Sequence, residues 1–567
     1  MSEKNTHDST VTTESATADY DAIVVGAGFS GLYLLHRLRD EFDLSVKVIE
    51  KADDVGGTWY WNRYPGARCD SESHVYCYSF NDEILEEWDW SERYPEQPEV
   101  LEYLRFVADH LDLRRDIDFE REVTSAVFDE AGGRWEITTD DGTQETARYF
   151  VSAVGCLSKP FIPNFDGVDS FEGDWYHTGK WPHEPVDFSD KRVAVIGTGA
   201  TGIQVIPEVA PEAGELTVFQ RTPNYAVPAR NRPLDDDDRA EIKRNYDEIL
   251  ERAHNSGFGH PFEAAHETAD GLSREEVEEV LQPRWAEGGF RYMLTFEDLI
   301  ENPETNEYVS EFIRDKIRET VDDPAVAEKL VPTDHYYATK RPPLHTNYYE
   351  TFNRDNVTLV DVRETPIERI TPDGVRTTDA DYEFDLIIYA TGFDAMTGTL
   401  LQMDIRGRDG LTLEEKWDDG PKTYLGLSVH GFPNMFTITG PQSPSVLSNM
   451  PVSIEHHVEW VSETIKSLVD RDVQLIEPTK RAEDAWTEHN RQVGEATLYT
   501  EADSWYMGDN VPGKPRVFTP YVGGVDVYHE TILEAAEKDY EGFELTESVQ
   551  NLGRQGEQPR LSVMEGD

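Results

Sequence analysis

Two glycine-rich loops give the chain its clearest chemical signal. Gly26, Gly28 and Gly31 follow a short apolar run and open a stretch with helical spacing. In that context the first glycine permits a tight turn, the second lets a pyrophosphate approach the backbone, and the third lets the helix pack closely on the strand. Glu50 stands 24 residues after Gly26 and can accept hydrogen bonds from ribose hydroxyls. This loop therefore predicts a site for FAD or NAD, whose adenosine ribose carries no phosphate.

The second loop has the same spacing but a different charge at the matching position. Gly197, Gly199 and Gly202 again follow an apolar run, and Arg221 stands 24 residues after Gly197. A guanidinium there offers a forked donor to a 2′-phosphate, and Thr222 can add a hydrogen bond. The loop therefore predicts a site for NADP, with an ordinary surface ion pair as the alternative for Arg221.

The elements that must position these loops are two β-α-β units, at about residues 20–50 and 192–220. Apolar and polar residues alternate from about 119 to 150, which predicts antiparallel strands between the units. Residues 235–330 are charged and helical in pattern, and strand signals resume after Lys340. We therefore expect an α/β protein with two dinucleotide-binding (Rossmann-like) domains, for FAD and NADP, and a helical insertion in the NADP domain.

The expected domain divisions follow from these patterns. They are a disordered tail at 1–19, an FAD domain at 20–158 and 392–552, an NADP domain at 159–229 and 336–391, a helical insertion at 230–335, and a disordered tail at 553–567.

The acidic composition narrows the range of partners. The 567 residues include 113 Asp plus Glu against 52 Lys plus Arg, a formal net charge of −61. Such a surface repels phosphate backbones and anionic lipid headgroups, which argues against nucleic-acid and membrane-surface binding. With 38% hydrophobic and 11% aromatic residues the chain can bury large cores. We interpret the charge as adaptation to a salt-rich cytoplasm, where screening shortens repulsion, with an ordinary acidic protein as the alternative.

Targeting signals and metal-binding patterns are missing from the sequence. No apolar run approaches the roughly 18 residues of a membrane span, and the first twenty residues lack a signal-peptide core, so a cytoplasmic location is expected. Cys69, Cys77 and Cys156 form no C-x-x-C pair, which argues against a disulfide framework, a metal site and a redox dithiol. A flavoprotein reduced by NADPH would then pass its electrons to oxygen, a quinone or a small protein.

A segment between the two loops extends the prediction from cofactors to a family. Phe171, Gly173, His177 and Trp181, followed by Pro182, match F-x-G-x-x-x-H-x-x-x-W-P at every defined position. This segment resembles the fingerprint of Baeyer–Villiger monooxygenases, which are class B flavoprotein monooxygenases, and the likeness is greatest to the branch that includes phenylacetone monooxygenase. The resemblance covers about residues 20–545 and includes the stretches 56–61, 63–70, 390–394, 504–506 and 512–516.

The resemblance implies a reaction and a catalytic pair. In such enzymes NADPH reduces FAD, the reduced flavin adds oxygen at C4a, and the resulting peroxide attacks a ketone to give an ester or lactone. Arg341 matches the family's active-site arginine, a fixed cation that can stabilise the anions formed. Asp70 matches the carboxylate that holds this arginine in place. The ordinary alternatives are a plain ion pair for Arg341 and a turn cap for Asp70.

Other matched positions imply binding and positioning. Lys340 matches a second contact to the 2′-phosphate, with a solvated surface lysine as the alternative. Trp505 matches a tryptophan on a mobile loop that covers NADP, with a core tryptophan as the alternative. His177 is expected to be a hydrogen-bonded hinge histidine between the domains and not a base, and Phe171 and Trp181 are expected to be packing residues.

The resemblance also assigns the cofactor contacts residue by residue, and no metal site. The positions expected to contact FAD are Gly26, Gly28, Ser30, Gly31, Glu50, Gly57, Thr58, Trp59, Asp70, Tyr76, Val123 and Met450. The positions expected to contact NADP are Arg68, Cys69, Asp70, Gly197, Thr198, Gly199, Thr201, Gly202, Gln204, Arg221, Thr222, Lys340 and Trp505. The expected hinge residues are Phe171, Gly173, His177 and Trp181.

The substrate is less defined than the cofactors. Residues 440–450 resemble a segment that returns to the flavin and shapes the substrate pocket, but residues 342–345, Cys156 and 442–447 follow no pattern that assigns one ketone. The expected partners are a ketone and O₂, without nucleic acid or membrane, and the chain is expected to be a monomer or a weak oligomer. One alternative is a flavin monooxygenase that oxygenates amines or sulfides. An alternative from a different class is a flavin- and NADP-binding redox sensor or binding module without turnover.

Overall fold

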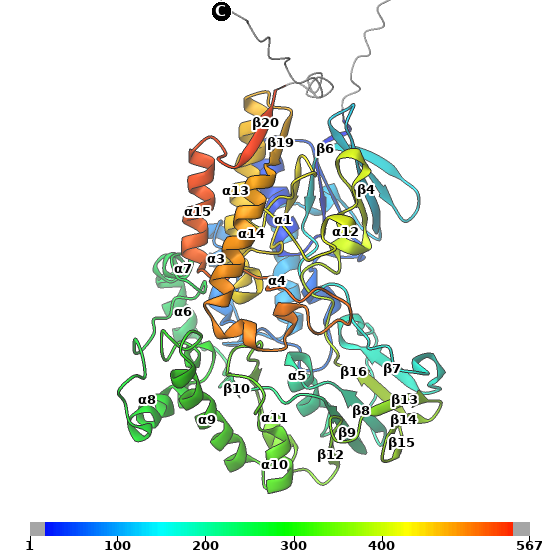
Figure 1. Ribbon diagram of the computed structural model, residues 1–567, viewed down its shortest axis with the longest axis vertical. Coiled ribbons are helices and arrows are strands. Elements are labelled where there is room, and N and C mark those ends of the chain that lie inside the picture. The colour runs from blue at the N-terminus through cyan, green and yellow to red at the C-terminus, as the bar shows by residue number, and fades with distance from the viewer. Residues whose placement is uncertain (1–17, 548–567) are drawn as a thin grey trace, which may run out of the picture.

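The computed structural model describes residues 18–547, and two sheets organise the chain, one in the upper and one in the lower part of Figure 1. The predicted tails at 1–19 and 553–567 lie outside the described residues, except for Ala18 and Asp19. Asp19 is held in place, because its carboxylate accepts a hydrogen bond of 2.7 Å from the Thr146 hydroxyl. Ordered structure thus begins at least one residue earlier than expected.

The first sheet carries the first glycine loop. Its strands are β1 (Tyr20–Val25), β2 (Val46–Ile49), β3 (Ile117–Asp118), β4 (Val123–Asp129), β5 (Arg134–Thr139), β6 (Gln144–Ser152), β17 (Asp404–Arg406) and β18 (Met435–Thr437). They lie in the order β17-β4-β5-β6-β1-β2-β3, and β18 also pairs with β6. β1 is parallel to β2 and β6, whereas β4, β5 and β6 are antiparallel, which confirms the strands predicted for 119–150.

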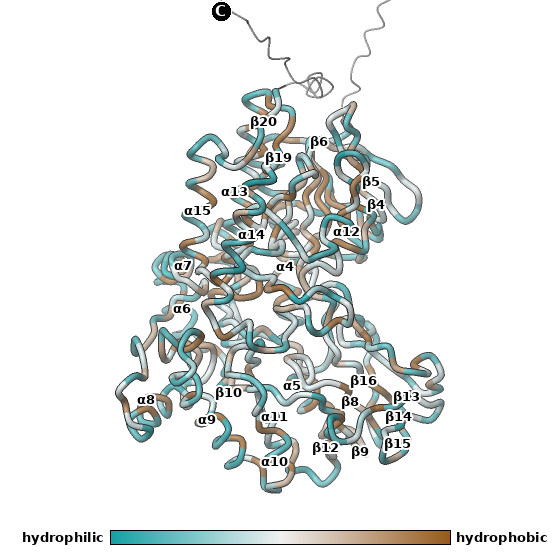
Figure 2. Tube along the Cα trace, viewed as in Figure 1, coloured by the Kyte–Doolittle hydropathy of each residue, from teal (hydrophilic) through white to brown (hydrophobic). Residues whose placement is uncertain are grey.

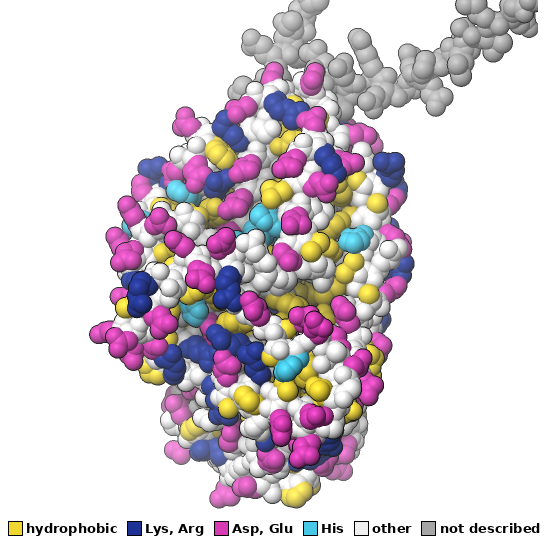
Figure 3. All heavy atoms as spheres, turned by 90° about the vertical axis from the view of Figure 1, so that its left-hand side faces the viewer, with side chains coloured by type: hydrophobic (Ala, Val, Ile, Leu, Met, Phe, Trp, Pro, Cys, Tyr) yellow, Lys and Arg dark blue, Asp and Glu magenta, His cyan; other side chains and the backbone are white. Residues whose placement is uncertain are grey.

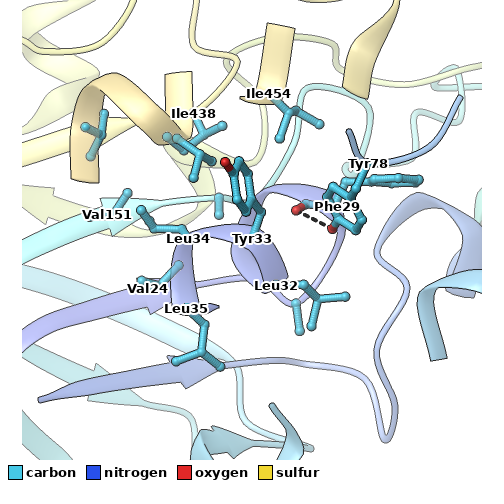
Figure 4. Packing of buried hydrophobic residues seen from close by; sticks show 14 of the residues in the cluster. Val24, Phe29, Leu32, Tyr33, Leu34, Leu35, Tyr78, Val151, Ile438 and Ile454 are labelled. Atoms are coloured by element: carbon cyan, nitrogen blue, oxygen red, sulfur yellow. Dashed lines mark hydrogen bonds between the residues drawn. The ribbon is translucent and has the colours of Figure 1, made fainter. Parts of the chain in front are cut away.

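The core of this part lies where α1 (Phe29–His36) packs between the first sheet and α13 (Met450–Asp470). Figure 4 shows Tyr33 projecting from α1 toward Ile438, with Ile454 of α13 close by. Strand β1 is covered on both faces, as is usual for a central parallel strand, which explains its uninterrupted apolar run. Its central residues are fully buried: Ala22, Ile23 and Val24.

The second sheet carries the second glycine loop. Its strands are β7 (Asp174–His177), β8 (Arg192–Ile196), β9 (Glu215–Gln220), β12 (Val357–Asp361) and β16 (Leu386–Tyr389), in the order β12-β9-β8-β16-β7. All neighbours are parallel, and α5 (Ala200–Val209) follows the second glycine loop within the predicted β-α-β unit. The fingerprint segment, whose residues were expected at a hinge between the domains, supplies the edge strand β7, where His177 pairs with Tyr389.

The predicted helical insertion is confirmed as a group of helices after β9. They are α6 (Asp236–Arg244), α7 (Tyr246–His254), α8 (Arg274–Glu287), α9 (Pro303–Thr320) and α10 (Pro324–Leu330). The remaining helices are α2 (Thr58–Trp61), α3 (Asp82–Glu87), α4 (Gln97–His110), α11 (Tyr348–Thr351), α12 (Leu413–Lys416), α14 (Lys480–Glu495) and α15 (Val525–Glu537). The remaining strands are β10 (Val227–Pro228), β11 (Leu344–His345), β13 (Ile367–Thr371), β14 (Gly374–Thr377), β15 (Asp381–Glu383), β19 (Leu475–Pro478) and β20 (Phe543–Thr546). The chain is thus an α/β protein with two Rossmann-like units and a helical insertion.

Hydropathy and charge are distributed as expected for a folded acidic protein. Figure 2 shows apolar residues concentrated in the strands of the two sheets, with polar residues along the outer helices. Figure 3 shows acidic side chains scattered over the whole visible face without one dominant cluster. Among residues 18–547, no helix is both long and apolar enough to cross a membrane.

Candidate active site

A cavity of about 970 Å³ lies between the two glycine loops and is lined by residues of both Rossmann-like units. Most of the predicted site residues line it: Gly26, Gly28, Ser30, Glu50, Gly57, Thr58, Trp59, Arg68, Cys69, Asp70, Tyr76, Val123, Gly197, Thr198, Gly199, Thr201, Gln204, Arg221, Thr222, Lys340, Arg341, Met450 and Trp505. The predicted residues that are not part of this lining are Gly31, Gly202, Phe171, Gly173, His177 and Trp181. Folding therefore brings two glycine loops that are 171 residues apart in the sequence to one cavity.

The two glycine loops have nearly the same geometry. Gly26 has φ +108°, and a Cβ there would lie 2.6 Å from the Ala153 carbonyl oxygen. A Cβ on Gly31 would lie 1.8 Å from the Gly26 carbonyl oxygen, and one on Gly202 would lie 2.3 Å from that of Gly197. Gly31 and Gly202 therefore allow the close packing of helix on strand and do not need to line the cavity.

Both helices begin at the cavity without a side-chain cap. Gly28 is the N-cap of α1 and Gly199 is the N-cap of α5, and neither helix has a side-chain hydrogen bond at that end. A Cβ on Gly199 would meet nothing within 4 Å, so the space in front of it is open. The free N–H groups of a helix start and its positive dipole end suit a phosphate. The residues present thus fit two dinucleotide cofactors.

Glu50 lines the cavity but is already engaged by the backbone. It is 5% exposed, and its two carboxylate oxygens accept hydrogen bonds from the amides of Ala27 (2.7 Å) and Ala52 (2.8 Å). Burial raises the pKa of Glu50, and the backbone amides oppose this. Each oxygen has further lone-pair capacity, so the expected contact to ribose hydroxyls remains sterically and chemically open.

Arg221 and Lys340 form a pair of cations at the second unit. Burial lowers the pKa of Lys340, Asp334 opposes that shift, and the positive charge of Arg221 adds to it. Neither cation has a carboxylate within 4 Å among residues 18–547, so the surface ion pair considered for Arg221 is absent there. Two neighbouring cations with no carboxylate in direct contact within the described chain are typical of a site for a bound anion.

Arg341 is held by contacts from four parts of the chain. Its Nη2 lies 3.5 Å from Oδ2 of Asp70, and its Nη1 donates to the Val446 carbonyl at 3.2 Å. The guanidinium lies 5.2 Å from the centroid of the Phe290 ring. The Asn224 amide donates to the Arg341 carbonyl at 2.9 Å, which fixes the backbone as well. Sequence patterns missed Phe290 and Asn224, because only tertiary packing brings them to residue 341. Val446 lies in the segment 440–450 that was expected at the flavin, but its contact with Arg341 was not predicted.

Asp70 provides an open acceptor at the same place. Its Oδ1 is buried and has no hydrogen-bond partner among the described residues. Burial raises the pKa of Asp70, and the Arg341 guanidinium opposes this. A buried acceptor without a partner costs free energy unless a ligand supplies a donor. Asp70 therefore serves as a counter-ion for Arg341 with one oxygen left for a ligand.

The fingerprint residues Phe171, His177 and Trp181 are packed in the interior of the protein and do not line the cavity. His177 is 3% exposed, its Nδ1 accepts a hydrogen bond of 3.0 Å from the Gly179 amide, and burial lowers its pKa to about 4. A Cβ on Gly173 would lie 2.6 Å from Cζ of Phe171, and Phe171 and Trp181 are buried in two separate cores. These positions favour a structural role over proton transfer to a substrate.

Gln204 and Trp505 both line the cavity, but Gln204 is held by hydrogen bonds and Trp505 by a ring contact. The Gln204 side chain accepts a hydrogen bond from the Tyr64 hydroxyl (2.7 Å) and donates to the Arg68 carbonyl (3.1 Å), so it joins α5 to a loop of the first unit. Trp505 lies in a turn at the cavity wall with its ring 4.3 Å from that of Tyr506.

The charge of the cavity differs from that of the chain. Its lining includes more basic than acidic side chains, in a protein with more than twice as many acids as bases. The basic residues are Lys51, Arg68, Arg121, Lys180, Arg221, Lys340 and Arg341, and the acidic residues are Glu50, Asp70, Glu122 and Asp503. Positive charge is thus retained where anionic cofactors would bind.

The fold and cavity define a flavoprotein class with two dinucleotide sites, and comparisons agree. The model of the flavin-binding monooxygenase-like family matches residues 20–231. A Baeyer-Villiger monooxygenase of Pseudooceanicola batsensis is 47% identical over 534 residues, which cover 94% of this chain and 97% of that protein. The phenazine N-monooxygenase of Lysobacter antibioticus is 46% identical over 527 residues, covering 92% and 96%. A solved structure, an oxidized steroid monooxygenase bound to NADP, is 51% identical with a TM-score of 0.89, covering 93% of this chain and 100% of that one.

At these identities, over nearly the whole length of each protein, the chain belongs to the Baeyer–Villiger monooxygenase family.

Proposed function

We propose that the chain is an FAD-containing monooxygenase that uses NADPH and O₂ to convert ketones to esters or lactones. The observation that carries the proposal is the Arg341–Asp70 pair at a cavity between two glycine loops, with Oδ1 of Asp70 buried and without a partner. Membership of the Baeyer–Villiger family and 51% identity to a structure bound to NADP support it.

The two units would hold the two cofactors in distinct ways. The start of α1 would bind the FAD pyrophosphate and Glu50 its ribose, while the start of α5 would bind NADP and Arg221 with Lys340 its 2′-phosphate. When bound, the flavin supplies the transfer of electrons from NADPH to oxygen. The protein contributes binding, orientation and charge.

Arg341 would provide the electrostatic part of catalysis. Its guanidinium stays protonated at working pH, so it acts as a fixed positive charge and not as a proton donor. Such a charge stabilises the negative oxygen that develops on the ketone carbonyl when it is attacked. Asp70 and the Val446 carbonyl hold the guanidinium in one orientation before the reaction, which avoids reorganisation at that step.

A second candidate is oxygenation of an aromatic or aliphatic nitrogen. The specific observation in its favour is the 46% identity to phenazine N-monooxygenase over almost the full chain. The fixed Arg341 cation favours the ketone reaction, since a ketone develops an oxyanion when attacked and an amine does not.

The test begins with the FAD-loaded protein mixed with NADPH in air. We expect bleaching of the flavin absorbance followed by its return, and ester or lactone formation with at least one member of a panel of linear, cyclic, aryl and steroid ketones. Bleaching with N-oxide or sulfoxide as the only product would favour the second candidate. An absence of bleaching would favour a redox sensor or binding module without turnover and would contradict both monooxygenase proposals.

The charge of −61 supports a further part of the proposal, that the protein works in a salt-rich cytoplasm as a monomer or weak oligomer. Acids scattered over the surface repel one another and also repel a second copy of the chain. Sedimentation at low and molar salt would measure the oligomeric state.

A further inference from the structure

Three chain segments meet beside the cavity at Asp394. The chain crosses from the first sheet to the second after β6 and returns after β16, and we call residues 153–173 and 390–403 the crossing segments. They are joined by backbone hydrogen bonds, including the Asp394 amide to the Lys159 carbonyl at 2.8 Å. The third segment, residues 503–516, is here called the strap, and its Asp503, Ser504, Trp505 and Asn510 line the cavity.

Lys514 provides the ionic attachment of the strap to this junction. Nζ of Lys514 lies 2.8 Å from Oδ1 of Asp394 and donates to the Ala395 carbonyl at 2.6 Å. The other carboxylate oxygen of Asp394 lies 3.0 Å from Nζ of Lys159, on the first crossing segment. The Asn510 amide adds a hydrogen bond of 2.7 Å to the Phe393 carbonyl. One carboxylate thus joins all three segments.

This ion pair differs from most surface pairs of the chain. The side chains of Lys514 and Asp394 are only 13% and 14% exposed, so water screens their interaction less than it does an exposed pair. Burial works to raise the pKa of Asp394, but Lys514 and Lys159 hold it below its usual range. Removing Lys514 would leave Asp394 paired with Lys159 and would take away the ionic contact between this carboxylate and the strap.

We propose that Lys514 is a positioning residue that, through Asp394, fixes the strap to the two crossing segments and so closes the nicotinamide-nucleotide side of the cavity. The inference rests on the proposed function in that the enclosed ligand is NADP(H). A fixed strap would slow the release of the nucleotide and exclude water from the reacting groups. Because both crossing segments take part, movement of one sheet relative to the other would also loosen the strap.

Hydrogen–deuterium exchange of the FAD-loaded protein, with and without NADP⁺, tests the proposal. In Lys514→Gln we expect strap amides to exchange about tenfold faster, the loss expected for a partly buried charged contact. KM for NADPH should rise by about tenfold while kcat changes by less than about twofold, because the catalytic groups are untouched. Lys514→Arg keeps the charge and should restore both values to within about threefold.

Lys159→Gln is the matched control, since it removes a lysine from the same carboxylate but leaves the Lys514 contact in place. Its strap should exchange within about twofold of the parent. Unchanged strap exchange in Lys514→Gln, or faster exchange spread evenly over both sheets, would overturn the proposal. Failure of the parent to oxidise NADPH would instead overturn the proposed function, and exchange without nucleotide would still measure the attachment of the strap.

Discussion

Two pairs of charged residues line the cavity and are arranged in opposite ways: Arg341 with Asp70, and Lys340 with Arg221. Arg341 and Lys340 are neighbours in the chain. Arg341 has a carboxylate 3.5 Å away, a carbonyl on its Nη1 and an aromatic ring beneath it. Lys340 instead lies near a second cation, Arg221, and has no carboxylate within 4 Å among the described residues. A charge that protein contacts already hold in place can act on a reacting atom, whereas cations with no carboxylate in contact are suited to bind an anionic ligand. We therefore propose that the neighbouring residues Arg341 and Lys340 serve catalysis and nucleotide binding separately.

The largest effect that separates the two pairs is expected at Arg341. Arg341→Ala should lower ester formation by about a thousandfold or more, as loss of a fixed oxyanion-stabilising group does. Flavin reduction by NADPH should persist, because the cations at 221 and 340 remain. Stopped-flow reduction and product analysis measure the two steps separately.

Arg341→Lys serves as the control, because it keeps the charge and loses the fork that bridges Asp70 and Val446. Partial product formation is expected. Near-normal ester formation by Arg341→Ala would remove Arg341 from the catalytic role.

The next effect concerns the choice of nucleotide. Arg221→Ala should raise KM for NADPH by about thirtyfold, the value of a charge-assisted contact of about 2 kcal/mol, and leave KM for NADH almost unchanged. Steady-state kinetics with both nucleotides measure the ratio. Arg376→Ala removes the same charge at an exposed pair with Asp381 and should leave the ratio as it is. Equal losses with NADPH and NADH in Arg221→Ala would mean that the 2′-phosphate assignment is wrong.

The sequence predicts the glycine loops more directly than it predicts the charged residues between them. The strands around each loop follow from apolar runs, and β8 begins at residue 192 as the predicted unit does, because a buried parallel strand leaves a local pattern. The glycine roles also follow locally, since a Cβ on Gly31 or Gly202 would overlap a backbone carbonyl. Arg341 and Asp70 were indicated only by family resemblance.

Other features could not be predicted because they depend on packing between distant segments. The backbone amides on Glu50, the edge strand formed by the fingerprint, and the carbonyl of Val446 on Arg341 all arise in this way. The attachment of Lys514 to Asp394 bridges 120 positions of the sequence and leaves no periodic signal. Local steric rules thus fix the loops, and tertiary contacts fix the charges between them.

Salt should affect the outer surface and the cavity in opposite directions. Raising KCl from 0.2 to 2 M should raise Tm by about 5 °C or more, because screening weakens repulsion among the surface acids. The same change should weaken NADPH binding severalfold, since Arg221 and Lys340 attract a phosphate through charge. Calorimetry and nucleotide titration measure the two trends. Full stability in dilute buffer would contradict adaptation to a salt-rich cytoplasm while leaving the enzyme assignment unaffected.

The smallest expected effect is a pH dependence of the preference for NADPH over NADH, caused by Lys340 alone. Burial and the nearby Arg221 charge lower the pKa of Lys340, so in the free enzyme this side chain loses its proton below the usual lysine range. Its attraction for a 2′-phosphate is therefore complete at low pH and declines as pH rises through that pKa. The ratio of kcat/KM for NADPH to that for NADH should fall by a few-fold on the alkaline side. Lys340→Arg, which stays protonated, should remove this decline. A ratio that falls equally in the parent and in Lys340→Arg would assign the titration to another group. Lys340 would then keep its charge over the same pH range as Arg341, and this difference between the two neighbouring cations would disappear.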